Sequence, residues 1–130
     1  MSDEVTFTTR ELDVMSILWR LGSGTVREVR EAMKNDLDED LGYTSVLKFL
    51  QVLEKKGHVR HEQEGRAYRY HPTVDAMDAG RTAMGRVVDK IFHGSSEAAL
   101  ARLVEDRPPS LDEARRMRKL LDQVVKSHKA

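Results

Sequence analysis

Hydrophobic residues recur at helical spacing near the start of the chain. Four apolar positions between residues 8 and 21 are spaced to share one helix face, and we expect them to face a core: Leu12, Met15, Leu18 and Trp19. Thr8 and Glu11 form the pattern of a capping box, in which each satisfies a backbone N–H near the other. Gly22 can take the left-handed conformation that ends a helix. The pattern therefore predicts an amphipathic helix over residues 8–21.

A second helix is predicted directly afterwards. Thr25 and Glu28 form another capping box, and it opens the stretch TVREVREAMK, residues 25–34. The apolar residues of this stretch lie on one face: Val26, Val29 and Met33. The following residues 35–42 are rich in acidic side chains and predict a solvated turn.

A third helix and a β-hairpin follow. The helix is expected from about Thr44 to Lys56, with Gly57 as its stop. Its apolar stripe consists of Val46, Leu47, Leu50 and Leu53. Residues 58–64 and 67–71 flank a short Gly-Arg connection, and tyrosines in the second segment favour extended structure. Residues 1–72 thus predict three helices and a hairpin in that order.

The remaining residues predict three more helices. They cover about 73–93, 96–106 and Ser110 to Lys126. Apolar positions gather near one face of the first and last of these: Val74, Met77, Met84, Val88 and Ile91, then Leu111, Ala114, Leu121 and Val125. Three helices with little aromatic content make a poor core on their own. We predict that they pack against a second copy of the chain, and the alternative is packing on the N-terminal part of the same chain.

Charge is distributed unevenly along the 130 residues, although the formal net charge is zero. Residues 43–72 hold six Lys and Arg against three Asp and Glu, so this segment is the one that a polyanion would attract. The absence of cysteine excludes disulfides and thiolate chemistry. No apolar run reaches the ~18 residues of a membrane span, and the acidic first ten residues do not resemble a signal peptide. We expect a cytoplasmic protein without membrane insertion.

The polar face of the third predicted helix is a candidate for DNA recognition. Its positions are Ser45, Lys48, Val52 and Lys55, with Thr44 and Gln51 beside them. Lys48 can donate to guanine, Gln51 can pair with adenine, and Lys55 can hold a phosphate. An ordinary solvated helix face is the alternative. The basic hairpin that follows, with Arg66 at its tip and Arg69 on its second strand, favours a winged helix–turn–helix.

Catalysis and metal binding have little support. His58, His61 and His71 are loosely spaced, and the first two would point to opposite faces of a strand. No pair of residues suggests a nucleophile beside a base. We therefore expect no enzyme activity, no metal site and no cofactor.

Several motifs together resemble the penicillinase-repressor family (BlaI/MecI/CopY). They are ELDVMSILW, YTSVL, LEKKGHV and GRAYRY, in that order, and the similarity extends from about Phe7 to Val125. The resemblance implies a mainly helical protein with a small β-hairpin. It divides into a winged helix–turn–helix domain, 1–72, and a helical dimerisation domain, 73–130. The implied function is repression of transcription by a homodimer on a palindromic double-stranded DNA operator.

The resemblance also assigns roles to residues. Thr44, Ser45, Lys48 and Gln51 become candidates for base contacts, and Arg66 and Arg69 for wing contacts. The expected dimerisation residues are Val88, Ile91, Phe92, Leu100, Leu103, Leu121 and Val125. Relatives that control antibiotic resistance are relieved by proteolysis that a membrane-bound sensor protease triggers, so such a protease is a further expected partner.

The chain departs from the family pattern at three points. It has no cysteine, which excludes the copper site of the copper-responsive relatives. Its only asparagine, Asn35, precedes Asp36, so the Asn-Phe bond that is cut in resistance repressors is missing. Val52 stands where many relatives have Arg. A protein-interaction module that docks a partner through Val52 and Phe49 is the rival hypothesis.

Overall fold

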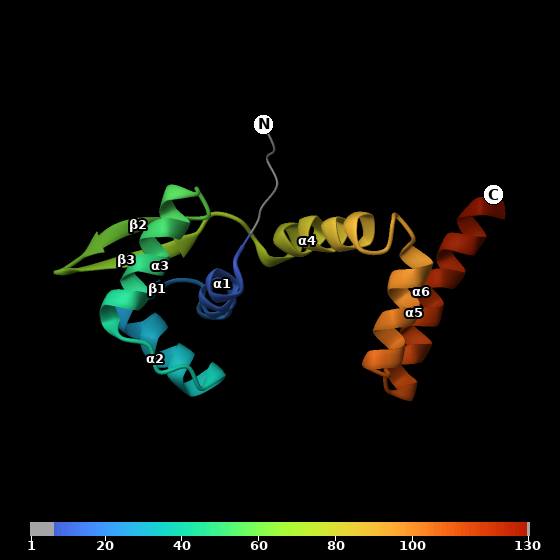
Figure 1. Cartoon of the computed structure of the whole chain (residues 1–130), viewed down its shortest axis with the longest axis horizontal. Helices are drawn as coiled ribbons and strands as arrows, with labels where there is room; N and C mark the ends of the chain where they lie inside the picture. Colours follow the sequence, from blue (N-terminus) through green and yellow to red (C-terminus); the bar gives the residue numbers. More distant parts are fainter. Residues whose placement is uncertain (1–6, 130) are drawn as a thin grey trace. The chain divides into compact units, whose positions relative to one another are not determined.

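The computed structural model describes residues 7–129 (Figure 1). The chain divides into two compact units, one ending at Gly85 and the other beginning at Arg86. The division falls inside α4, whereas the predicted boundary after Pro72 separates DNA binding from dimerisation. That functional boundary stays a prediction. No helix among the described residues is long and apolar enough to cross a membrane.

The first unit begins with three helices, α1 (Thr9–Leu21), α2 (Val26–Leu37) and α3 (Tyr43–Lys55). Both predicted capping boxes are present at the starts of α1 and α2, with the threonine hydroxyl accepting from the glutamate N–H and the glutamate carboxylate accepting in return. Gly22 and Gly57 have φ near 86° and 85°, which a side chain would strain, and each follows the end of a helix.

A three-stranded antiparallel sheet belongs to the same unit. The predicted hairpin is present as β2 (Val59–Glu64) and β3 (Ala67–Pro72). Sequence reasoning missed β1 (Gly24–Thr25), which pairs with β3 so that the strand order is β1-β3-β2. Two residues carry too little pattern to predict a strand, and β1 exists because β3 lies beside it.

One hydrophobic core fills the space between the three helices and the sheet. Its buried residues come from α1, α2, α3, β2 and β3: Val14, Met15, Ile17, Leu18, Val26, Val29, Ala32, Met33, Val46, Leu50, Leu53, Val59 and Tyr70. Trp19 packs at its edge and donates from Nε1 to the carbonyl of Val74 at 2.8 Å. This bond joins α1 to the segment that precedes α4.

Two sequence expectations in this unit are wrong. Leu12 is 46% exposed, because the helix face toward the core is centred on Val14 and Leu18 instead. The helix α2 also continues to Leu37, through residues that were expected to form a turn. Its end is set by Asp38, which takes the left-handed conformation at φ 53°.

The rest of the chain is helical: α4 (Ala76–Lys90), α5 (Ser96–Asp106) and α6 (Leu111–Lys129). The helices α5 and α6 run back alongside each other (Figure 1), and a cavity of about 350 Å³ lies between them, lined by Leu103 of α5 and Met117 of α6. Ser95 and Ser110 cap the two helices by accepting from the N–H groups of Ala98 and Glu113. No residue of α5 or α6 is buried.

Candidate nucleic-acid interface

The predicted face of α3 is exposed. Val46, Leu50 and Leu53 anchor the helix in the core, as expected from their spacing. The opposite positions lie at the surface: Thr44, Ser45, Lys48, Gln51 and Lys55 are exposed and Val52 is half-buried. Among residues 7–129, no carboxylate pairs with Lys48. The exposed face of the helix therefore presents hydrogen-bonding side chains to solvent, and such groups can contact bases and phosphates.

An ion pair fixes the end of α3. The Nζ of Lys56 lies 2.8 and 3.0 Å from the two carboxylate oxygens of Glu11, which is buried at the start of α1. Burial raises the pKa of Glu11, but the hydrogen bonds from Lys56 and from the Thr8 N–H outweigh it and hold the pKa below its ordinary value. The glutamate that sequence reasoning recognised only as a helix cap thus also holds α3 against α1.

A histidine joins α3 to the hairpin. The Nδ1 of His61, on β2, lies 2.6–2.7 Å from both carboxylate oxygens of Glu54 on α3. Its ring also packs against Tyr68 and Tyr70, with centroid distances of 4.6 and 5.7 Å. His61 was considered as a metal ligand, and the structure gives it this contact between the helix and the wing. Within the described residues, no group of three His, Asp or Glu side chains could hold a metal ion.

A groove of about 780 Å³ lies between α3 and the hairpin. Its lining includes the cations Arg27 and Arg66, the aromatic rings of Tyr43 and Tyr68, and the amide of Gln51. The carboxylates of Glu54 and Glu64 also line it, and they are engaged by His61 and Arg69. Sequence reasoning singled out Gln51 and Arg66 but missed Arg27 and Tyr43. These two residues come from the first turns of α2 and α3, and only the packing of those helices brings them to one wall.

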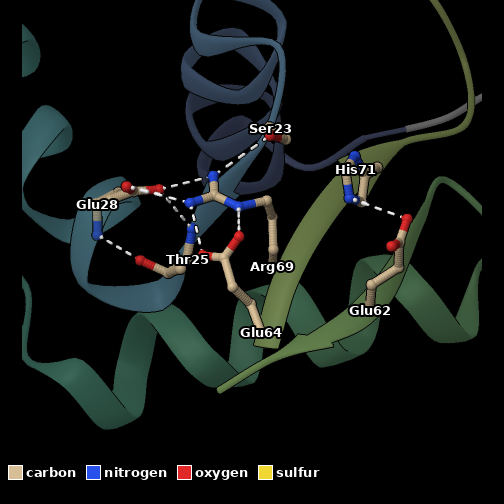
Figure 2. A network of polar contacts seen from close by, with 7 residues as sticks. All are labelled: Ser23, Thr25, Glu28, Glu62, Glu64, Arg69 and His71. Carbon is tan, nitrogen blue, oxygen red and sulfur yellow. Dashed lines mark hydrogen bonds and ion pairs between the residues drawn. The ribbon is translucent and has the colours of Figure 1, made fainter. Parts of the chain in front are cut away.

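The two wing arginines have different surroundings. Arg66 is exposed in the turn between β2 and β3, where Gly65 has φ 62°, and no carboxylate of residues 7–129 pairs with it. Arg69 lies on β3 and is engaged by Glu64, Glu28 and Ser23 (Figure 2). The prediction that both arginines contact DNA is untested, but the geometry of Arg69 differs from that of an open phosphate contact.

The predicted dimerisation residues remain accessible within one chain. Ile91, Leu103, Leu121 and Val125 are exposed, and Val88, Phe92 and Leu100 are half-buried. Further apolar side chains are exposed on the same helices: Met77, Met84, Val87, Leu111, Leu120 and Val124. One chain by itself therefore leaves the apolar faces of α4 and α6 in contact with water.

Comparison with known proteins identifies the family. The model of the penicillinase repressor family matches residues 7–123. The chain belongs to the penicillinase repressor family. The transcriptional regulator BlaI of Mycobacterium tuberculosis is 37% identical over 91% of this chain and 84% of its own length. The methicillin resistance regulatory protein MecI of Staphylococcus aureus is 20% identical, over 89% of this chain and 93% of its length.

Solved structures agree with the fold of the first unit. The DNA-binding domain of the repressor BlaI matches with a TM-score of 0.51 and 28% identity, over 60% of this chain and 93% of that domain. A complex structure of hsRosR matches 93% of this chain with a TM-score of 0.55 but only 17% identity, which shows likeness of fold alone. The predicted fold class is confirmed, and so is the predicted function class. This chain is a DNA-binding transcriptional repressor of its family and not an enzyme.

Proposed function

We propose that this repressor acts as a cytoplasmic homodimer on an operator with two related half-sites. In each half-site α3 enters the major groove, where Thr44, Ser45, Lys48 and Gln51 contact base edges. Lys55 holds a phosphate, and Val52 offers methyl groups to a thymine. Arg66 at the tip of the wing reaches the adjacent backbone or minor groove. A two-fold dimer places the half-sites about one helical turn, near 10 bp, or a multiple of it apart.

The observation that carries this proposal is the exposed polar face of α3 beside the groove that also contains Arg66. The contacts of Lys56 with Glu11 and of His61 with Glu54 hold that helix in the unit. DNA binding therefore costs little conformational entropy at this face. The exposed apolar faces of α4 and α6 support a dimer, because a second copy of the chain would cover them.

The test is a fluorescence-anisotropy titration of the purified protein with DNA from its own upstream region, a scrambled duplex and several salt concentrations. We expect a preference of ~10³ or more for the upstream DNA and a steep loss of affinity with salt. Lys48→Ala should remove the preference. If Lys48→Ala binds like the wild type while Val52→Asp abolishes capture of a protein partner, the protein-docking hypothesis replaces this one.

A membrane-bound sensor protease is the regulator that the family suggests. A protease that relieved this repressor would have to cut at a bond other than Asn-Phe, because Asp36 follows the single asparagine. Immunoblots of cells before and after induction test this step, since a shortened chain must appear as repression is lost.

A further inference from the structure

Arg69 uses its guanidinium entirely within the protein (Figure 2). Its Nε donates to Glu64 Oε1 at 3.0 Å, and Nη2 donates to Glu64 Oε2 at 2.9 Å and to Glu28 Oε2 at 3.3 Å. Its Nη1 donates to Glu28 Oε1 at 2.9 Å and to Ser23 Oγ at 3.3 Å. An arginine has five N–H donors, and these contacts occupy all of them. No donor remains for a phosphate oxygen in this arrangement.

The partners of Arg69 come from two different parts of the fold. Glu64 is the last residue of β2, so this contact spans the wing hairpin itself. Glu28 belongs to the capping box of α2, where its carboxylate also accepts from the Thr25 N–H at 3.0 Å. Thr25 lies directly opposite Arg69 in the pairing of β1 with β3. The guanidinium therefore joins the wing to the start of α2 at the point where β1 meets the sheet.

The side chain of Arg69 also lies on the sheet face away from α3. Successive residues on a strand point to opposite faces, and the neighbouring Tyr70 is buried in the core. Glu62, which is paired with Arg69 across the hairpin, lies on the same outer face and contacts His71 (Figure 2). The wing arginine on the groove side is Arg66, which lines the groove next to α3.

We propose that Arg69 is a positioning residue, which fixes the wing to α2 so that Arg66 and α3 meet DNA in one fixed geometry. This inference rests on the proposed DNA binding. Charge-assisted bonds of a bidentate arginine define orientation as well as attraction, which suits a brace between two elements. Hydrogen bonds to Glu64 and Glu28 raise the pKa of Arg69, and Arg69 holds the pKa of Glu64 below its ordinary value, so the network stays ionised around neutral pH.

A phosphate contact and a positioning role for Arg69 predict opposite effects of a substitution at its partner Glu28. If Arg69 contacted a phosphate, Glu28 would compete with the DNA, and Glu28→Gln would tighten binding. If Arg69 instead fixes the wing to α2, Glu28→Gln should weaken DNA binding, although the variant carries one negative charge fewer. Glutamine also suits the third helical position of a capping box, so α2 keeps its start. Glu62→Gln is the matched control, because it removes a carboxylate from the same face of the sheet that pairs with Arg60 and His71 and accepts no hydrogen bond from Arg69.

The experiment is the anisotropy titration of the full chain with the upstream duplex, at several salt concentrations, for wild type and for variants at Arg69, Glu28, Glu62 and Arg66. We expect Arg69→Ala and Glu28→Gln each to weaken binding about threefold to tenfold while the salt slope stays unchanged. The double variant should be no weaker than Arg69→Ala. Arg66→Ala should lower the salt slope by about 0.9, the value for one lost phosphate contact. Glu62→Gln should not weaken binding.

Two results would overturn the positioning role of Arg69. One is a salt slope lowered by about 0.9 in Arg69→Ala, and the other is tighter binding by Glu28→Gln. Hydrogen exchange of the β1 and β3 amides separates this inference from the proposed function. If the wild type shows no preference for the upstream duplex, DNA recognition fails. Faster exchange in Arg69→Ala and Glu28→Gln then still supports the brace, whereas unchanged exchange rejects it.

Discussion

The two units of the chain bury their apolar residues to very different extents. In the first unit, three helices and the sheet enclose one core that includes Met15, Leu50 and Tyr70. In α5 and α6 no residue is buried, and Leu121 and Val125 are more than half exposed. The first unit thus has the core of a domain that is stable alone, whereas the second has apolar faces that only another surface can cover. A second copy of the chain is the surface that we propose covers them.

The largest expected effect on DNA affinity comes from disrupting the proposed dimer contact of the second unit. Leu121→Glu places a charge on the apolar face of α6, and we expect it to convert the dimer into monomers, which analytical ultracentrifugation measures. Because a monomer holds only one half-site, affinity for the full operator should fall by about 10²–10⁴. Lys119→Glu, on the opposite side of the same helix, is the charge control. Wild-type protein that is already monomeric would contradict the comparison.

A core substitution tests the first unit. Leu50→Ala removes a fully buried side chain from the middle of α3, and we expect the free energy of unfolding to fall by about 2–5 kcal/mol. Urea denaturation followed by Trp19 fluorescence measures it, since Trp19 packs against this core. Leu120→Ala in the exposed face of α6 is the matched control. An equal loss of unfolding free energy in both variants at low protein concentration would contradict the proposed difference in burial between the two units.

The buried end of the Glu11–Lys56 pair gives the first unit a pH dependence. Because folding lowers the pKa of Glu11 from its ordinary value of 4.5, its ionised form favours the folded state. This contribution is complete above that pKa and is lost as the pH falls through the folded value. We expect Glu11→Gln to destabilise the protein by about 1–3 kcal/mol at pH 7, and the difference should shrink in acid. Thermal unfolding at pH 3.5–7 checks it, and a constant difference would contradict it.

Matched helix caps give the smallest expected effect. Thr8→Ala removes the cap of α1 and Ser95→Ala removes that of α5, each with an expected cost of about 1 kcal/mol. The loss from Thr8→Ala should not depend on protein concentration. The loss from Ser95→Ala should appear in the concentration dependence of the melting temperature, because α5 belongs to the unit that we propose to dimerise. Differential scanning calorimetry at several concentrations distinguishes the two.

Local pattern was sufficient wherever neighbouring residues decide the structure. The capping boxes at Thr8 and Thr25, the hairpin around Gly65 and the polar face of α3 all follow from spacings of a few residues. Leu12 shows the limit of this method, because a three- or four-residue spacing allows several neighbouring faces. Which face is buried depends on the elements that pack against it, and here Val14 and Leu18 lie at the centre.

The sequence by itself determined the order of the helices and the hairpin, the apolar stripe of α3 and the basic character of residues 43–72. Only the tertiary structure decided which charges meet. Glu11 and Lys56 lie 45 residues apart, and Arg69 and Glu28 lie 41 apart. No spacing rule connects such pairs, because they meet only after the core and the pairing of β1 with β3 have formed. Local sequence thus predicts the side chains available for DNA, and long-range contacts decide which remain free to reach it.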